Sequence, residues 1–236
     1  MLAEEFAELR ESFYLSGHRK KVDLNVLPRF GELARRIRSE GRIGMHLDRL
    51  YILWQAVLAA PAGPVAEVGV YRGGSAKFIA EAIREAEREP VFYACDTFAG
   101  HASTDPIDAN HHVVEKFLDT SAAEVRHYLA SYPRLELLEG DIAETSARLA
   151  DERFGFVHID VDVYGATSFC LRFFAPRLLP GAVIVVDDYG FVTCPGAKQA
   201  VDEFLAEHDG FRLFHLITGQ ALLYQPSTHQ PVAAPG

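Results

Sequence analysis

Short apolar runs alternate with longer amphipathic stretches along the chain from residue 64 onward. The apolar runs predict buried strands at Val65–Val68, Val91–Cys95, Leu135–Leu138, Phe154–Ile159 and Gly181–Val186. The stretches between them predict helices at 74 to about 88, 121 to about 131, 142–149, 164–174 and after Pro195. Alternation of this kind implies parallel strands joined by right-handed crossovers. The chain is therefore expected to be an α/β protein with a doubly wound, mostly parallel sheet.

The two ends of the chain follow other patterns. Phe211–Ile217 and Ala221–Tyr224 flank a Thr-Gly-Gln turn and predict a terminal antiparallel hairpin. Helical spacing over Leu27–Ser39 and His46–Ala60 predicts an N-terminal helical extension over residues 1–63, which covers a sheet edge or forms a dimer surface. We expect one domain over 64–225, and a disordered tail over 226–236.

Composition limits the classes of protein and partner. The 236 residues fit one α/β domain, and an apolar fraction of 49% suffices for a large core. A net charge of −10 opposes binding to nucleic acid, and no apolar stretch approaches the roughly 20 residues of a membrane span. The acidic amino end lacks the features of a secretory signal, so we expect a cytoplasmic protein. Cys95, Cys170 and Cys194 lack metal-ligand spacing and are expected to be reduced packing residues.

Two adjacent carboxylates follow the most apolar strand of the chain. Val183–Val186 reads as a strand buried on both faces, so Asp187 and Asp188 emerge at its carboxyl end, where open α/β sheets bind ligands. Asp160 closes the preceding strand, and sequential parallel strands are usually neighbours. Three converging carboxylates predict a site for a hard divalent cation such as Mg²⁺. A solvated turn is the alternative for the Asp187–Asp188 pair alone.

Neighbouring residues of the Asp160 strand have simpler expected roles. Asp162 is expected to cap the helix that follows, with a place in the acid site or pairing with a backbone N–H as the alternatives. His158 lies one step deeper on the same strand face and is expected to be a satisfied core histidine.

The turn after the first strand has the composition of a cofactor site. Glycines in the segment Glu67–Ser75 allow close approach of a ligand, and the next helix begins there with free N–H groups. Its spacing departs from G-x-G-x-x-G, which disfavours a nicotinamide cofactor. Asp96 ends the second strand, where an acid accepts hydrogen bonds from ribose hydroxyls, or acts as a cap. Asp141 follows the third strand and either accepts from an adenine amino group or caps a helix.

The stretch from Thr97 to His112 is long, polar and without apolar periodicity. Loops of this length in compact domains are commonly lids. Its position after the second strand predicts a lid on the ligand side, mobile until a ligand orders it.

Four separated motifs together resemble a known family. EVGVYRGGSA, YACDTFAG, HIDVDVY and PGAVIVVDDYG, the last followed by CPGAKQAVDEF, are similar to the macrocin O-methyltransferase family over roughly residues 64 to 225. Members are Rossmann-like, class I S-adenosylmethionine enzymes that methylate sugar hydroxyls of natural products. The resemblance implies S-adenosylmethionine and Mg²⁺ as cofactors, with Mg²⁺ bound by Asp160, Asp187 and Asp188.

The resemblance also implies a cofactor set. The glycine turn would hold the methionine end, Asp96 the ribose and Asp141 the adenine side. The residues expected to contact the cofactor are Glu67, Gly69, Tyr71, Gly73, Ser75, Asp96, Thr97, Asp141 and Asp160.

Methyl transfer to an aliphatic hydroxyl requires removal of a proton, because the neutral oxygen is a poor nucleophile. Asp160 is the predicted catalytic base, with the lid histidines His101, His111 and His112 as substitutes. The expected acceptor is one hydroxyl of a vicinal diol, on a small molecule carrying a sugar. A catechol-type acceptor is the nearest alternative, although a polar lid without an aromatic cluster beside it favours a sugar. A non-catalytic S-adenosylmethionine-binding regulator is the alternative from another class.

Overall fold

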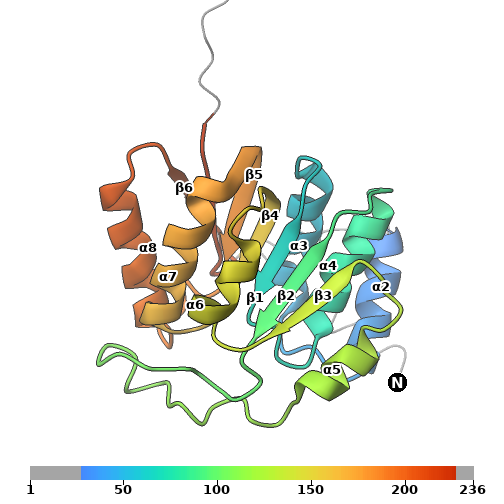
Figure 1. Cartoon of the computed structure of the whole chain (residues 1–236), viewed down its shortest axis with the longest axis horizontal. Helices are drawn as coiled ribbons and strands as arrows, with labels where there is room; N and C mark the ends of the chain where they lie inside the picture. Colours follow the sequence, from blue (N-terminus) through green and yellow to red (C-terminus); the bar gives the residue numbers. More distant parts are fainter. Residues whose placement is uncertain (1–27, 227–236) are drawn as a thin grey trace, which may run out of the picture.

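One sheet in the order β3-β2-β1-β4-β5-β7-β6 organises the computed structural model, which describes residues 28 to 226 (Figure 1). The strands are β1 (Val65–Val68), β2 (Phe92–Asp96), β3 (Leu135–Glu139), β4 (Phe154–Ile159), β5 (Leu178–Val186), β6 (Arg212–His215) and β7 (Ala221–Tyr224). The first five run parallel, and β7 pairs antiparallel with both β5 and β6. This confirms the predicted doubly wound, mostly parallel sheet with a terminal antiparallel hairpin.

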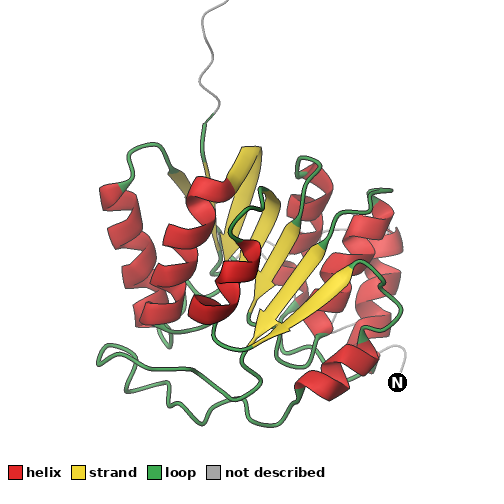
Figure 2. Ribbon diagram, in the orientation of Figure 1, coloured by secondary structure: helices red, strands yellow, loops and turns green. Residues whose placement is uncertain are grey.

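Helices cover both faces of the sheet (Figure 2). One face carries α2 (Pro28–Ser39), α3 (Leu47–Ala59), α4 (Gly74–Glu85) and α5 (Ala122–Tyr128). The other carries α6 (Ile142–Thr145), α7 (Tyr164–Phe174) and α8 (Pro195–Glu207), with the short 3-10 turns η2 (Ser146–Leu149) and η3 (Ala175–Arg177). The helices and strands agree with the predicted ones to within a few residues at their ends.

Successive strand residues contribute to two separate cores. Val65 and Phe156 pack into the core under α2, α3 and α4, whereas their neighbours Ala66 and Val157 pack into the core under α7 and α8. Side chains of a strand alternate between its two faces, so a strand covered on both sides must be apolar throughout. The continuous apolar runs in the sequence therefore come from burial in a three-layer arrangement.

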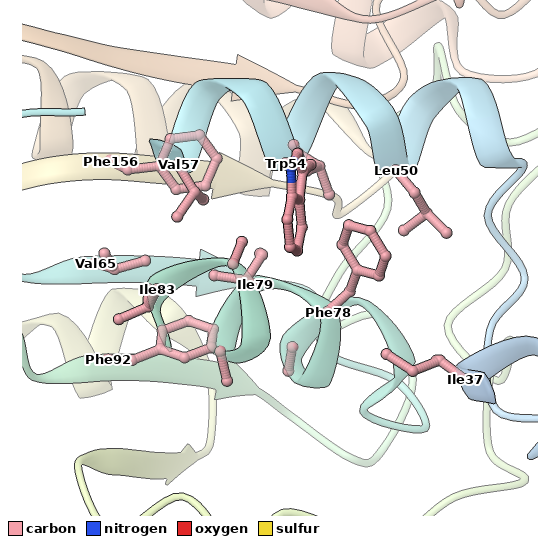
Figure 3. Packing of buried hydrophobic residues seen from close by; sticks show 14 of the residues in the cluster. Ile37, Leu50, Trp54, Val57, Val65, Phe78, Ile79, Ile83, Phe92 and Phe156 are labelled. Atoms are coloured by element: carbon pink, nitrogen blue, oxygen red, sulfur yellow. The ribbon is translucent and has the colours of Figure 1, made fainter. Parts of the chain in front are cut away.

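The N-terminal helices do not cover an edge of the sheet, which corrects the sequence expectation. α3 packs against α4 and β4 on one face, and α2 packs against α3 and α4. In Figure 3, Trp54 and Val57 of α3 lie against Phe78, Ile79 and Ile83 of α4. Trp54 is 4% exposed, so α3 buries its apolar positions within the same chain. The homodimer remains a prediction. The apolar positions of α3 that suggested it are buried within the chain and no longer support it.

Two expectations concern residues outside the described part of the chain. They are the first part of the helical extension, at 1–27, and the disordered tail beyond Pro226, at 227–236. Within 28–226, no helix has the length and apolarity that crossing a membrane requires. Cys95, Cys170 and Cys194 are buried free thiols, as expected for packing residues. Burial raises the pKa of Cys95 to about 12, which keeps its thiol protonated at neutral pH.

Candidate active site

A cavity of about 520 Å³ opens at the carboxyl ends of the parallel strands. Its walls come from the β1–α4 turn, the ends of β2, β3 and β4, the segment 42–45, and the start of the lid. The predicted site residues that line it are Gly69, Tyr71, Ser75, Asp96, Thr97, Asp141, Asp160 and Asp188. Glu67, Gly73 and Asp187 are not among the residues that line it. Ligand binding at this edge is the general rule for doubly wound sheets.

Three carboxylates meet at the ends of β4 and β5. Ile159 is paired with Val186, and the amide of Asp187 donates to the carbonyl of Ile159 at 2.9 Å, so Asp160 and Asp187 leave adjacent strands side by side. One carboxylate oxygen from each of Asp160, Asp187 and Asp188 lies within 4.8 Å of the others. The predicted convergence of these three acids is therefore present in the fold.

Asp187 is fully buried and already has cationic partners. Its carboxylate forms an ion pair with Arg49 of α3 and accepts a hydrogen bond from Nε2 of Gln220 at 2.8 Å. Nε2 of His158 lies 3.6 Å away on the inner side. Burial alone would raise the pKa of Asp187, but contact with His158 and Arg49 lowers it below its usual value.

Asp160 and Asp188 are in the opposite situation. Among the described residues neither carboxylate forms an ion pair, and each faces the other and Asp187. Burial, with repulsion from Asp187, raises the pKa of Asp160 well above its usual value; burial and repulsion from Asp160 do the same for Asp188. Crowded hard oxygens without a cationic partner are the donor set that Mg²⁺ binds, so these residues fit a divalent cation.

His158 joins Asp187 to Glu67 behind the cavity wall. Its Nδ1 lies 2.9 Å from Oε1 of Glu67, and both side chains are fully buried. Burial opposes charge on the imidazole, but the carboxylates of Asp187 and Glu67 outweigh it and raise the pKa of His158 to about 10. His158 is thus a buried histidine, as expected, held between two acids. Glu67 faces this histidine and not the cavity.

The β1–α4 turn is held in shape by Asp96. One oxygen of its carboxylate accepts from the amides of Val70 and Tyr71, each at 2.7 Å, and the other accepts from Phe98 at 2.7 Å. Gly69 has φ +93°, and a Cβ there would overlap the carbonyl oxygen of Asp160. A glycine is therefore required at position 69 because the chain at the end of β4 passes very close to it, whether or not a ligand also binds there.

The two candidate helix caps have different outcomes. Asp141 caps α6, since its Oδ1 accepts from the amide of Ala143 at 2.9 Å, and it also lines the cavity. Asp162 does not cap α7, which corrects the expectation. It has φ +63°, and its amide donates to Oδ2 of Asp188 at 3.3 Å. The left-handed backbone turns Asp162 toward the acid cluster before α7 begins.

Lid residues cap α7 instead. Asp108 accepts from the amide of Tyr164 at 3.0 Å, and Asp105 accepts from the amide of Gly165 at 3.1 Å. Asp108 is fully buried, although it belongs to a stretch that the sequence shows to be polar and without apolar periodicity. Nε2 of His112 lies 2.8 Å from the carbonyl of Thr193, which ties the lid to the segment before α8. The lid is therefore docked on helix N-termini, where carboxylates are favoured.

An aromatic cluster borders the lid, contrary to the sequence expectation. The Phe117 ring lies 5.3 Å from the ring of Tyr71 and 5.6 Å from that of His101, measured between centroids. Phe117 lies beyond the predicted lid boundary at His112, in an irregular segment that continues to Thr120. The absence of such a cluster therefore no longer favours a sugar over a catechol.

Sequence reasoning missed the contribution of the N-terminal extension. Arg42, Met45 and Arg49 line the cavity, and Arg49 reaches the acid cluster. One feature of the sequence could have indicated this role for Arg49. It lies four positions before the buried Leu53, so a basic residue lies on an otherwise apolar face of α3.

The fold and site define a doubly wound α/β protein with a cofactor-sized cavity and an acid cluster at the strand ends. Residues 44–222 match the macrocin O-methyltransferase (TylF) family, and the chain belongs to this family. The chain is 33% identical to mycinamicin III 3''-O-methyltransferase of Micromonospora griseorubida over 159 residues, 62% of this chain and 61% of that protein.

Two further relatives cover more of the chain. It is 26% identical to 8-demethyl-8-(2,3-dimethoxy-alpha-L-rhamnosyl)-tetracenomycin-C 4'-O-methyltransferase of Streptomyces olivaceus over 77% of both proteins. The O-methyltransferase NovP has a similar structure, with a TM-score of 0.68 and 25% identity over 78% of this chain and 81% of NovP.

Proposed function

We propose that this protein is an S-adenosylmethionine- and Mg²⁺-dependent O-methyltransferase that acts on one hydroxyl of a vicinal diol, on a sugar of a glycosylated natural product. The convergence of Asp160, Asp187 and Asp188 beside the cavity is the observation that carries the proposal. Family membership supports it, as do two relatives that are named as O-methyltransferases, one of them for a rhamnosyl compound.

The cavity offers separate positions for the two substrates. S-adenosylmethionine would lie along the β1–α4 turn, from Gly69 and Ser75 toward Asp96 and Asp141. Glu67 and Gly73 would act by shaping this turn from behind. The acceptor would lie between Asp160, Asp188 and the lid.

Asp160, Asp187 and Asp188 would hold Mg²⁺. The bound ion would polarise the acceptor hydroxyls and so favour loss of a proton from the reacting one. An ion held by these three carboxylates would still have room for oxygens of the acceptor, which is why a vicinal diol is the proposed substrate. An acceptor held at these residues by both hydroxyls would have its reacting oxygen oriented toward the methyl group of S-adenosylmethionine.

A catechol-type acceptor is the second candidate, because Tyr71, Phe117 and His101 form an aromatic contact beside the cavity. Aromatic rings pack favourably at offset or perpendicular geometry, and these side chains would receive a phenolic ring.

A panel of vicinal-diol glycosides, their mono-deoxy analogues and catechols would test the proposal. We expect turnover that depends on both S-adenosylmethionine and Mg²⁺, and a loss on the mono-deoxy analogues nearly as large as that on metal removal. Full activity in the presence of excess chelator, or on the mono-deoxy acceptors, would contradict a mechanism in which Mg²⁺ binds both hydroxyls of the acceptor. Cofactor binding without turnover of any acceptor would indicate the regulator.

A further inference from the structure

The three lid histidines have different surroundings, although the sequence offers them as equivalent. His111 is exposed. His112 is buried, but Nε2 lies 2.8 Å from the carbonyl of Thr193 and Nδ1 lies 3.1 Å from Nζ of Lys116. Both of its nitrogens are thus engaged in holding the lid. Neither histidine lines the cavity.

His101 combines burial with an unused nitrogen. It is 9% exposed, lines the cavity, and its Nε2 has no hydrogen-bond partner among residues 28–226. A buried polar atom without a partner is costly, and such atoms commonly mark functional positions. The backbone holds this residue in place, because the His101 amide donates to the carbonyl of Val114 at 3.0 Å.

A row of titratable groups connects His101 with the acid cluster. A nitrogen of His101, one of His112 and a carboxylate oxygen of Asp162 lie within 4.8 Å of one another. Asp162 in turn lies within 4.8 Å of Asp188 by the same measure. A small acceptor held at Asp160 and Asp188 would therefore face His101 across the cavity.

We propose that Nε2 of His101 is the general base that takes the proton from the acceptor hydroxyl. The assignment rests on the proposed function. As the O–H bond breaks, its proton moves to Nε2, the oxygen forms a bond to the methyl carbon, and the carbon–sulfur bond breaks with its electron pair left on sulfur. The products are the methyl ether, S-adenosylhomocysteine and an imidazolium, which releases its proton to solvent. Asp162 lies where its charge stabilises that imidazolium.

The charged neighbours of His101 are consistent with this role. Burial lowers its pKa below the usual value of 6.5, helped by His112 and Lys116 and opposed by Asp162 and Asp108. The imidazole is therefore neutral at neutral pH, and in the tautomer with its proton on Nδ1 the Nε2 atom is able to accept. Asp160 is less suited, because a carboxylate that holds a divalent cation has a reduced affinity for protons.

The test measures kcat with saturating S-adenosylmethionine and Mg²⁺, on whichever glycoside or catechol of the panel the wild type methylates. We expect His101→Gln to lower kcat by about 100-fold or more, the range of general-base catalysis, with S-adenosylhomocysteine affinity unchanged by calorimetry. In wild type kcat should rise with pH through a pKa below 6.5, and this limb should vanish in the variant. Imidazole should restore activity to His101→Ala, and His111→Gln serves as the matched control.

The possible outcomes distinguish failure of the His101 assignment from failure of the proposed methyltransferase function. If wild type methylates an acceptor while His101→Gln keeps kcat and the acid limb, His101 is not the base and the proposed function stands. If imidazole fails to rescue His101→Ala although this variant binds S-adenosylhomocysteine normally, the side chain acts by positioning the lid. If wild type methylates no member of the panel, both the proposed function and the role of His101 are overturned.

Discussion

The guanidinium of Arg49, on the N-terminal helix α3, is paired with the carboxylate of Asp187 at the end of β5. The Arg49 side chain is 15% exposed and that of Asp187 is fully buried. Asp187 is thus neutralised from one side by a residue outside the sheet, whereas neither Asp160 nor Asp188 forms an ion pair within residues 28–226.

Replacing Arg49 should make stability depend on metal. Arg49→Gln leaves Asp187 buried with one fewer cationic partner, and breaking such a pair costs about 3–5 kcal/mol of unfolding free energy. Added Mg²⁺ should restore more stability to the variant than to wild type, because it supplies the missing charge. Thermal melts with and without Mg²⁺ measure this. Arg42→Gln is the control, since Arg42 also lines the cavity but bonds the carbonyl of Arg72. Equal Mg²⁺ responses in wild type and Arg49→Gln would contradict the prediction.

Asparagine variants of the acid cluster should separate metal binding from proton transfer. We expect Asp187→Asn and Asp160→Asn each to weaken Mg²⁺ activation, and high Mg²⁺ to recover part of the activity in both, because each variant retains two carboxylates. Titration of activity with Mg²⁺ gives the apparent affinity and the plateau. If Asp160 is the base, as the sequence predicted, saturating Mg²⁺ will not recover the plateau of Asp160→Asn.

Asp96 should be required both for folding and for cofactor binding. Asp96→Ala leaves three amides without their acceptor, and an unsatisfied buried group costs about 1–3 kcal/mol. S-adenosylhomocysteine should also bind more weakly, since the turn that lines the cavity loses its support. Melts and calorimetry give the two effects. Asp119→Ala provides the comparison, because Asp119 contacts Tyr71 and Arg72 from an exposed position. Unchanged cofactor affinity in Asp96→Ala would remove Asp96 from the site.

The lid should loosen when Asp108 is replaced. Its carboxylate accepts from the first amide of α7, and loss of such a cap costs about 0.5–2 kcal/mol. Limited proteolysis within residues 97–120 should be faster in Asp108→Ala, and His111→Gln should cleave like wild type. We also expect cofactor and acceptor together to slow cleavage in wild type. Cleavage at the same rate in both variants would mean that other contacts hold the lid.

Local patterns were sufficient to predict the elements of the fold. The continuous apolar runs predicted buried parallel strands, because a strand covered on both faces needs apolar residues at every position. Ser121 lies at the start of the helix predicted at 121 to about 131 and caps α5, since its Oγ accepts from the amide of Glu124 at 3.3 Å. Both signals act over a few residues, so no tertiary information was needed.

The sequence also determined the acid cluster, because the ends of the strands were visible in the apolar pattern and consecutive parallel strands are usually neighbours. Asp160 and Asp187 come directly after neighbouring strands, so their convergence follows once those strands pair in parallel. The fold class and three of the site's carboxylates were thus determined by pattern alone.

Only the tertiary structure decided which side chains surround that cluster. Arg49 reaches Asp187 across 138 residues of sequence, and His101 differs from His111 only in how the lid docks on α7 and α8. Asp162 lost its expected capping role to Asp105 and Asp108, which approach α7 from the lid. Such contacts join segments that are distant in sequence and irregular in conformation. No periodicity encodes them, because their geometry arises only when the helices and the lid pack around the completed sheet.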